Sequence, residues 1–282
     1  MLCAAASFTT GNMVQANALS EQLAIKAVLL LPCAVIFTFI FALFSSCLKN
    51  GAMRFSAATV PIMTGLYLSG CTCILLLNIS RIPAAICEII GGAFGFRQGV
   101  YGGLAGILLS ARYGMSIGLL SHEAGLGTAP IAHCEVKGAK AETSASLGIL
   151  EVYADTFLGA FYTAMCIIVT RTENAAKAFG SVFGSYGEVF VTVCLALFAL
   201  SSCISWHFYG VRAVKRLNSK KGIRVYTIVY CVVMLLAFFV SARRAYFFSD
   251  VTNILMAMIN IIALLTVNRG KNLFFTTLQP RD

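Results

Sequence analysis

Apolar stretches about 20 residues long recur along the whole chain, with only short polar gaps between them. A helix needs about 20 mostly apolar residues to cross the hydrocarbon core of a bilayer. Of the 282 residues, 59% are apolar and only 11% are charged, which leaves too few polar side chains to cover a water-soluble domain of this size. The sequence therefore predicts an all-α, polytopic membrane helix bundle.

Charged residues, glycines and prolines divide the chain into eight candidate spans within a single membrane domain, residues 1–282. The predicted spans are roughly 1–20, 24–48, 58–78, 98–133, 143–170, 186–211, 223–240 and 250–268. The gap 80–97 contains Pro83, Glu88 and a Gly-Gly pair. It favours an interfacial or re-entrant helix that is too short to cross the bilayer.

The basic residues predict the orientation. The net charge is +10, but these residues lie between spans, so cytoplasmic loops beside anionic lipid explain them better than a nucleic-acid partner does. If both termini are cytoplasmic, thirteen Lys and Arg residues lie in gaps on the cytoplasmic side and seven lie in gaps on the outside. Arg243 and Arg244 are among the seven, and Arg112 lies within a span. Most of the bias comes from residues 212–224. We expect a multi-pass protein of the cell (inner or plasma) membrane with both termini in the cytoplasm.

Enzyme and metal chemistry have no visible place in the sequence. No phosphate-binding loop or Cys-Xaa-Xaa-Cys pair occurs. Four possible metal ligands, His122, Glu123, His133 and Cys134, have the spacing of neither a zincin helix nor a zinc ribbon. We expect no catalytic residues, no bound metal and no cofactor, although a membrane enzyme that uses His122 and Glu123 is an alternative.

The fourth span, 98–133, is too long for one straight crossing and is predicted to be broken. Its middle, from Gly118 to Pro130, holds glycines, a serine, a threonine and a proline, which weaken a helix. Irregular backbone at membrane depth is tolerated only where it is buried in protein or lines a cavity. In transporters such breaks bind substrate carboxylates and cations. The alternative is a long tilted helix whose glycines allow close packing.

Two other spans carry polar side chains that need partners. Asn12 and Gln15 are three residues apart and share a helix face, where they could bind a neighbouring helix or a polar ligand; taken alone, these residues favour the neighbouring helix. Ser201 and Ser202 could supply oxygen ligands to a small hard cation. They could equally hydrogen-bond within their own helix.

The stretch from Arg112 to Pro130 resembles the signature of the sodium:alanine symporter family, the alanine or glycine:cation symporters. The resemblance covers essentially the whole chain and includes Gly11–Gln15, Asn78–Pro83, Asp155–Thr156, Phe198–Gly210 and Met256–Asn260. It implies a leucine-transporter-type fold of two inverted five-helix repeats. It also implies cotransport of alanine or glycine with Na⁺.

Site residues follow from the same resemblance. Gln15 is similar to the family's substrate-contacting amide, and residues 121–128 resemble the unwound segment around the amino acid. The implied substrate-binding residues are Gln15, Asn12, Ser121, Glu123, Gly125, Gly127 and Thr128, and the implied cation-binding residues are Ser201 and Ser202. The chain departs from the family pattern at His122, Ile117 and Val211, where Asn, Arg and Glu are usual.

The family's first core helices have no counterpart before Met1, so the resemblance implies an N-terminally truncated member whose spans are helices three to ten. Two interpretations remain open. The chain is a sodium-coupled symporter, or it is a truncated or degenerate, non-transporting remnant. It could also be half of a split transporter with a separately encoded N-terminal part.

Overall fold

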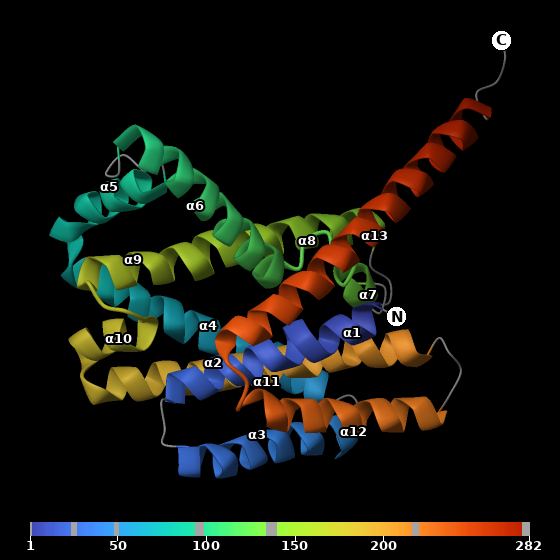
Figure 1. The fold of residues 1–282 in the computed structure, drawn as a ribbon, viewed down its shortest axis with the longest axis horizontal. Helices are drawn as coiled ribbons and strands as arrows, with labels where there is room; N and C mark the ends of the chain where they lie inside the picture. Colours follow the sequence, from blue (N-terminus) through green and yellow to red (C-terminus); the bar gives the residue numbers. More distant parts are fainter. Residues whose placement is uncertain are drawn as a thin grey trace.

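The computed structural model describes residues 2–23, 27–47, 51–93, 99–133, 140–215 and 220–277. Every regular element among these residues is a helix (Figure 1). The prediction of a membrane helix bundle is confirmed. Within the predicted loop 212–224, residues 216–219 lie outside the described residues.

The elements follow one another with short connections. In chain order they are α1 (Leu2–Phe8), η1 (Thr9–Met13), α2 (Val14–Leu23), α3 (Ala27–Cys47), α4 (Gly51–Leu77), η2 (Ile79–Arg81), α5 (Ile82–Ala93), α6 (Gly99–His122), α7 (Ala129–His133), α8 (Ala141–Ala154), η3 (Asp155–Ala160), α9 (Phe161–Thr170), α10 (Ala175–Phe183), α11 (Ser185–Lys215), α12 (Lys220–Ala237) and α13 (Ala242–Thr277). The segments η1 and η3 are π-helical turns inside longer helices.

Four helices among the described residues are long and apolar enough to cross a membrane, namely Arg54–Leu77, Glu142–Thr170, Ser185–Lys215 and Ala242–Val267. The apolar helix Leu29–Ser45 is shorter. The predicted first span corresponds to α1, η1 and α2, and the predicted fourth span to α6 and α7. The gap 80–97 contains the short helix α5, as its Gly/Pro pattern indicates, whereas the short helix α10 was not anticipated.

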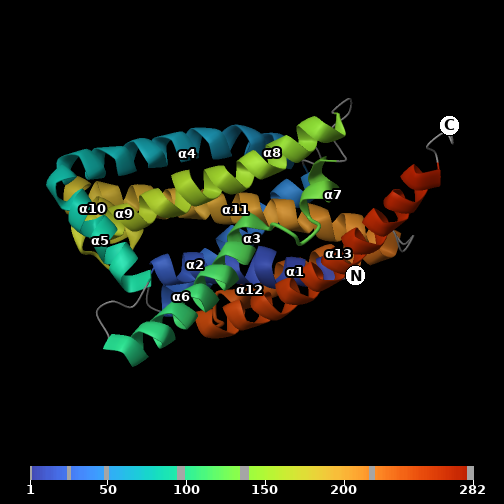
Figure 2. The ribbon, with the colours of Figure 1, turned by 90° about the horizontal axis from the view of Figure 1, so that it is seen from above.

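Helix α11 runs through the bundle and contacts α1, α2, α4, α10 and α12 (Figures 1 and 2). On one side, Phe41, Tyr230 and Phe238 form a buried cluster with α11. On the other side, Phe179 of α10 packs with Cys71 of α4 and the α9 residues. Because lipid is as apolar as these side chains, close packing rather than exclusion of water holds such helices together.

Gly11 allows η1 to approach α11 closely. A Cβ atom at Gly11 would overlap the side chain of Trp206. Farther along α2, Gln22 Nε2 donates a hydrogen bond to Thr192 Oγ1 at 3.2 Å. The two contacts show that α1–α2 and α11 run antiparallel, with Gly11 opposite Trp206 and Gln22 opposite Thr192.

The helix ends that flank residues 48–50, 134–139 and 216–219 gather at the same end of the bundle as Leu2 (Figures 1 and 2). Helix α13 begins at the opposite end, with Arg243 and Arg244 in its first turn. The two groups of helix ends therefore match the inside and outside gaps that were used to count Lys and Arg in the sequence. Which end faces the cytoplasm stays a prediction.

Candidate functional site

Helix α6 ends at His122, and six residues of irregular backbone lead to α7, which begins at Ala129. Three residues of this segment have positive φ angles, Glu123 at 52°, Gly125 at 79° and Gly127 at 82°. Glycine adopts this region without a steric penalty, and Pro130 fits because proline is tolerated in the first turn of a helix. The helix is therefore interrupted at the glycines and the proline, which are the residues that permit an interruption.

Glu123 occupies the first position of the break and is a non-glycine residue in the left-handed region. Such residues cluster at functional sites, because the surrounding structure must hold them in place. Its half-buried carboxylate interacts electrostatically with Thr128, Trp206 and Glu151. The Thr128 hydroxyl is fully buried beside this carboxylate.

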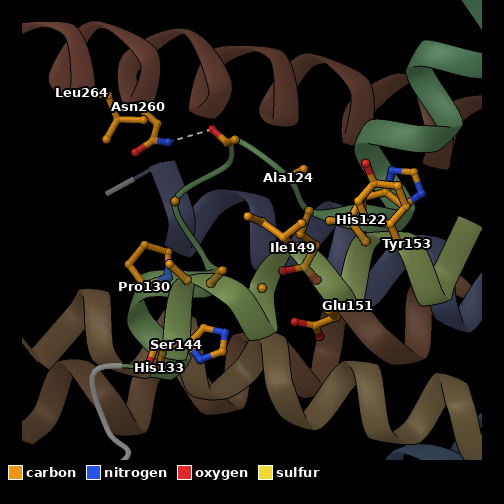
Figure 3. A pocket seen from close by; sticks show the side chains of 17 residues that line it. His122, Ala124, Pro130, His133, Ser144, Ile149, Glu151, Tyr153, Asn260 and Leu264 are labelled. Atoms are coloured by element: carbon orange, nitrogen blue, oxygen red, sulfur yellow. Dashed lines mark hydrogen bonds between the residues drawn. The ribbon is translucent and has the colours of Figure 1, made fainter. Parts of the chain in front are cut away.

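Two cavities flank the break. The larger, of about 850 Å³, is lined by Glu123, Gly125 and Gly127 of the break, by residues of α8 and by Asn260 of α13 (Figure 3). The smaller, of about 310 Å³, lies between the break, α8–η3 and α11. Its lining includes Ser121, Glu123, Thr128, Glu151, Asp155, Ser201, Ser202, Ser205, Trp206 and Tyr209.

Helix α13 holds the middle of the break. Asn260 Nδ2 donates a hydrogen bond to the Gly125 carbonyl oxygen at 2.9 Å (Figure 3). A Cβ atom at Gly127 would lie 3.0 Å from Asn260 Oδ1, so glycine also provides the space for this contact. The broken segment is thereby attached to a long helix that is distant in sequence.

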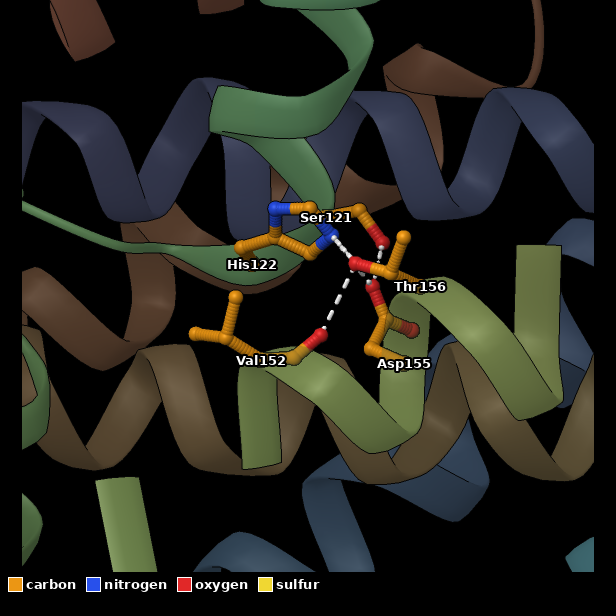
Figure 4. Close-up of polar contacts among 5 residues, drawn as sticks. All are labelled: Ser121, His122, Val152, Asp155 and Thr156. Carbon is orange, nitrogen blue, oxygen red and sulfur yellow. Dashed lines mark hydrogen bonds and ion pairs between the residues drawn. The ribbon is translucent and has the colours of Figure 1, made fainter. Parts of the chain in front are cut away.

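The last turn of α6 contacts the π-helical turn η3 (Figure 4). Ser121 Oγ donates to Asp155 Oδ2 at 2.5 Å. His122 Nε2 lies 2.8 Å from Thr156 Oγ1 and 3.4 Å from Asp155 Oδ2. The Thr156 hydroxyl also donates to the Val152 carbonyl at 2.9 Å, so His122 and η3 are joined by a continuous polar network. π-helical turns of this kind occur frequently at functional sites.

The structure brings most of the predicted site residues together. Ser121, Glu123 and Thr128 line the smaller cavity together with Ser201 and Ser202 from α11. Gly125 and Gly127 line the larger cavity on the other side of the break. Carboxylate, hydroxyl and carbonyl oxygens are the ligands that hard cations prefer. The smaller cavity supplies carboxylates and hydroxyls.

Asn12 and Gln15 line neither cavity. Asn12 is fully buried, and its Nδ2 donates to the Tyr230 carbonyl of α12 at 2.8 Å. Here the neighbouring-helix interpretation fits the geometry.

Gln15 is half-buried and has no hydrogen bond among the described residues. It lies one turn after Gly11 on the stripe that also holds Gln22. The antiparallel register places it opposite the turn of α11 that precedes Trp206, where Ser201 and Ser202 lie. Its role toward a substrate stays a prediction.

Several lining residues received no role from the sequence, chiefly Glu151, Trp206, Tyr209 and Asn260. One signal was available for Glu151, which is four residues before Asp155 and so shares its helix face. Ionisable residues inside a span are functional candidates by default. Among the described residues, no group of three or more His, Cys, Asp and Glu side chains is arranged to hold a metal ion.

Comparison with known proteins gives a consistent result. The model of the sodium:alanine symporter family matches residues 1–273. An uncharacterized transporter of Haemophilus influenzae is 28% identical over 279 residues, which cover 94% of this chain and 60% of the relative. The sodium/alanine symporter AgcS of Methanococcus maripaludis is 29% identical over 279 residues, 93% of this chain and 60% of that protein. The uncharacterized transporter YflA of Bacillus subtilis is 30% identical over 243 residues, 80% of this chain and 51% of the relative. The chain thus spans 51–60% of the length of these relatives.

Proposed function

Because the chain belongs to the sodium:alanine symporter family, we propose that it is a secondary active transporter that couples the movement of a small amino acid, alanine or glycine, to Na⁺. The family consists of transporters rather than enzymes. The proposed location is the cell membrane, crossed several times, with both termini in the cytoplasm.

The break between His122 and Ala129 is the observation that carries this proposal. Its backbone makes few hydrogen bonds of its own, since among the described residues the Gly127 and Thr128 N–H groups donate to no backbone carbonyl. Free N–H and C=O groups at a broken membrane helix bind the charged groups of an amino acid. The two cavities give such a ligand access to the segment from both sides.

The amino acid would bind against the broken segment. Its carboxylate would accept hydrogen bonds from backbone N–H groups around Gly127, and its ammonium group would face Glu123. Thr128, which lines the smaller cavity, would direct its hydroxyl toward the ligand.

Na⁺ would bind at the side of α11. Ser201 and Ser202 line the smaller cavity together with the carboxylates of Glu123 and Asp155. A hard cation prefers such oxygen ligands. Coupling between the two ligands would be reciprocal, because the factor by which Na⁺ changes the affinity for the amino acid is also the factor by which the amino acid changes the affinity for Na⁺.

The test is Na⁺-dependent binding and uptake of labelled alanine by the purified full chain in lipid vesicles, with choline as the replacement cation. We expect Na⁺-dependent signals that fall when Ser201 and Ser202 are changed to alanine. Ser181→Ala is the matched control, because Ser181 bonds its own helix in α10 and lies outside both cavities. Absence of Na⁺-dependent binding and uptake in the unchanged chain would overturn the proposal.

A further inference from the structure

A third cavity, of about 1230 Å³, lies between α6 and the beginning of α13 and shares no lining residue with the two cavities at the break. Its lining includes Arg112 of α6 together with Arg243 and Arg244 of α13. Asp250 is the carboxylate among the lining residues. Three guanidinium groups against one carboxylate leave an excess of two positive charges.

The three arginines are exposed, and none of them forms an ion pair within the described residues. Asp250 instead accepts a 2.7 Å hydrogen bond from Ser116 Oγ, which joins α13 to α6 across the cavity. The guanidinium groups are therefore available to an external anion. Arginine binds phosphate oxygens with two parallel hydrogen bonds, which makes phosphate the best-matched anion.

Exposed aromatic side chains also line this cavity. Tyr113 and Phe247 are 63% and 62% exposed, and Tyr246 and Phe248 are exposed beside them. Aromatic rings of this kind gather at the level of lipid headgroups, where the ring contacts acyl chains. A ligand that fits both the arginines and the rings has a phosphate group attached to an apolar chain.

The position of Arg243 and Arg244 also needs an explanation. They lie at the end of the bundle opposite the helix ends that flank residues 216–219 (Figure 1). The bias of Lys and Arg toward the cytoplasmic side accounts for the basic loop 212–224, but not for a pair of arginines at the other end. A local anionic ligand accounts for them.

We propose that the cavity between α6 and α13 binds the phosphate headgroup of an anionic phospholipid, with Arg112, Arg243 and Arg244 on the phosphate and the aromatic residues along the acyl chains. Basic pockets between membrane helices bind anionic headgroups on the cytoplasmic side, and we extend the same chemistry to the opposite end of the bundle. The exposed rings favour a lipid over free phosphate, since free phosphate has no apolar part to cover them. This inference does not depend on the proposed transport activity.

The experiment titrates the purified full chain in detergent with phosphatidylglycerol and measures lipid binding by native mass spectrometry. Phosphatidylcholine and inorganic phosphate serve as comparison ligands. We expect phosphatidylglycerol to bind more tightly than phosphatidylcholine. The triple variant R112Q/R243Q/R244Q should lose about a hundredfold in affinity, because each arginine beside an anionic headgroup contributes roughly a fivefold gain.

Arg171→Gln is the matched control, since Arg171 is also exposed but lies outside the cavity. It should retain the affinity of the unchanged chain. The variant R243K/R244K keeps the charge and removes the paired hydrogen bonds, so it should fall between the unchanged chain and the triple variant; thermal unfolding of each variant verifies the fold. Equal phosphatidylglycerol affinity in the triple variant, or equal binding of phosphatidylcholine, would overturn the proposal. Complete displacement by millimolar inorganic phosphate would instead assign a free-anion site and would also overturn it.

Discussion

The side-chain amide of Asn260 donates a hydrogen bond of 2.9 Å to the carbonyl oxygen of Gly125, 135 residues earlier in the chain. Gly125 lies in the middle of the broken segment, and Asn260 lies well inside the longest described helix, α13. The bond means that the irregular backbone is held from outside as well as by its own glycines. Movement of α13 would therefore change the shape of the segment that we propose binds the amino acid.

Asn260→Ala should weaken Na⁺-dependent alanine binding by about twofold to tenfold, because one hydrogen bond contributes roughly 0.5–1.5 kcal/mol. Affinity measured by radioligand binding to the purified chain tests this expectation. Asn78→Ala is the control, since Asn78 follows α4 directly and its Nδ2 donates to the Ile74 carbonyl of that helix at 2.9 Å. Unchanged affinity in Asn260→Ala would show that the bond does not organise a site.

Gly125→Ala should destabilise the chain by about 1–2 kcal/mol, because a φ of 79° is unfavourable for any residue with a Cβ atom. Space is not the cause, since no atom lies within 4 Å of a Cβ atom at this position. Gly127→Ala should cost more, because Asn260 crowds the added atom.

Gly114→Ala provides the comparison for both glycine variants. Gly114 lies inside α6 and also has nothing within 4 Å of an added Cβ atom. Alanine should be neutral or stabilising by up to about 1 kcal/mol there, because it favours the helix. Equal midpoints of thermal unfolding for Gly114→Ala and Gly125→Ala would contradict the left-handed backbone at Gly125.

Asn12→Ala and Gln15→Ala should separate a structural amide from a candidate binding amide. Asn12→Ala leaves the buried Tyr230 carbonyl without its side-chain donor, so it should lower stability by about 1–3 kcal/mol. Gln15 makes no hydrogen bond among the described residues, so Gln15→Ala should leave the unfolding midpoint unchanged and lower only the alanine affinity. A large loss of stability in Gln15→Ala, with affinity intact in the folded fraction, would assign it to helix packing.

Gly11→Ala should disturb the contact between η1 and α11, because the added Cβ atom overlaps the Trp206 side chain. Overpacking of this kind costs about 1–3 kcal/mol. Trp206 is the single tryptophan of the chain and is 3% exposed, so its fluorescence reports directly on the change. We expect a red-shifted emission maximum and a lower unfolding midpoint.

Gly65→Ala is the matched control for Gly11→Ala, because an added Cβ atom on α4 has no neighbour within 4 Å. It should leave both the emission maximum and the unfolding midpoint close to those of the unchanged chain. Identical emission from Gly11→Ala and the unchanged chain would show that the two helices are farther apart than the structure indicates.

Much of the site was predictable because its requirements are local. The glycines at 125 and 127 and the proline at 130 weaken a helix wherever they occur, and the structure interrupts the helix between His122 and Ala129. The hydroxyls of Ser201 and Ser202 were candidates for a cation on their chemistry alone. The contact of Asn260 with the broken segment was not predictable, because a polar residue in an apolar span can face any of several helices.

Asn12 illustrates the limit most clearly. Its amide needs a partner in lipid, which the sequence establishes, but the partner is the Tyr230 carbonyl, 218 residues away. Ser116 and Asp250 are a second example, because they form a hydrogen bond although they are 134 residues apart in the chain. The cavity beside them brings Arg112 together with Arg243 and Arg244, and no sequence motif predicts that meeting.

The sequence by itself determined that this protein is a membrane helix bundle and predicted where one of its helices breaks, because span length and backbone freedom depend on neighbouring residues alone. Only the tertiary structure decided which polar groups meet, because hydrogen bonds between helices depend on their relative register. That register is set by close packing at positions such as Gly11 and Trp206. It places the break, the α11 serines and the α13 amide around one pair of cavities.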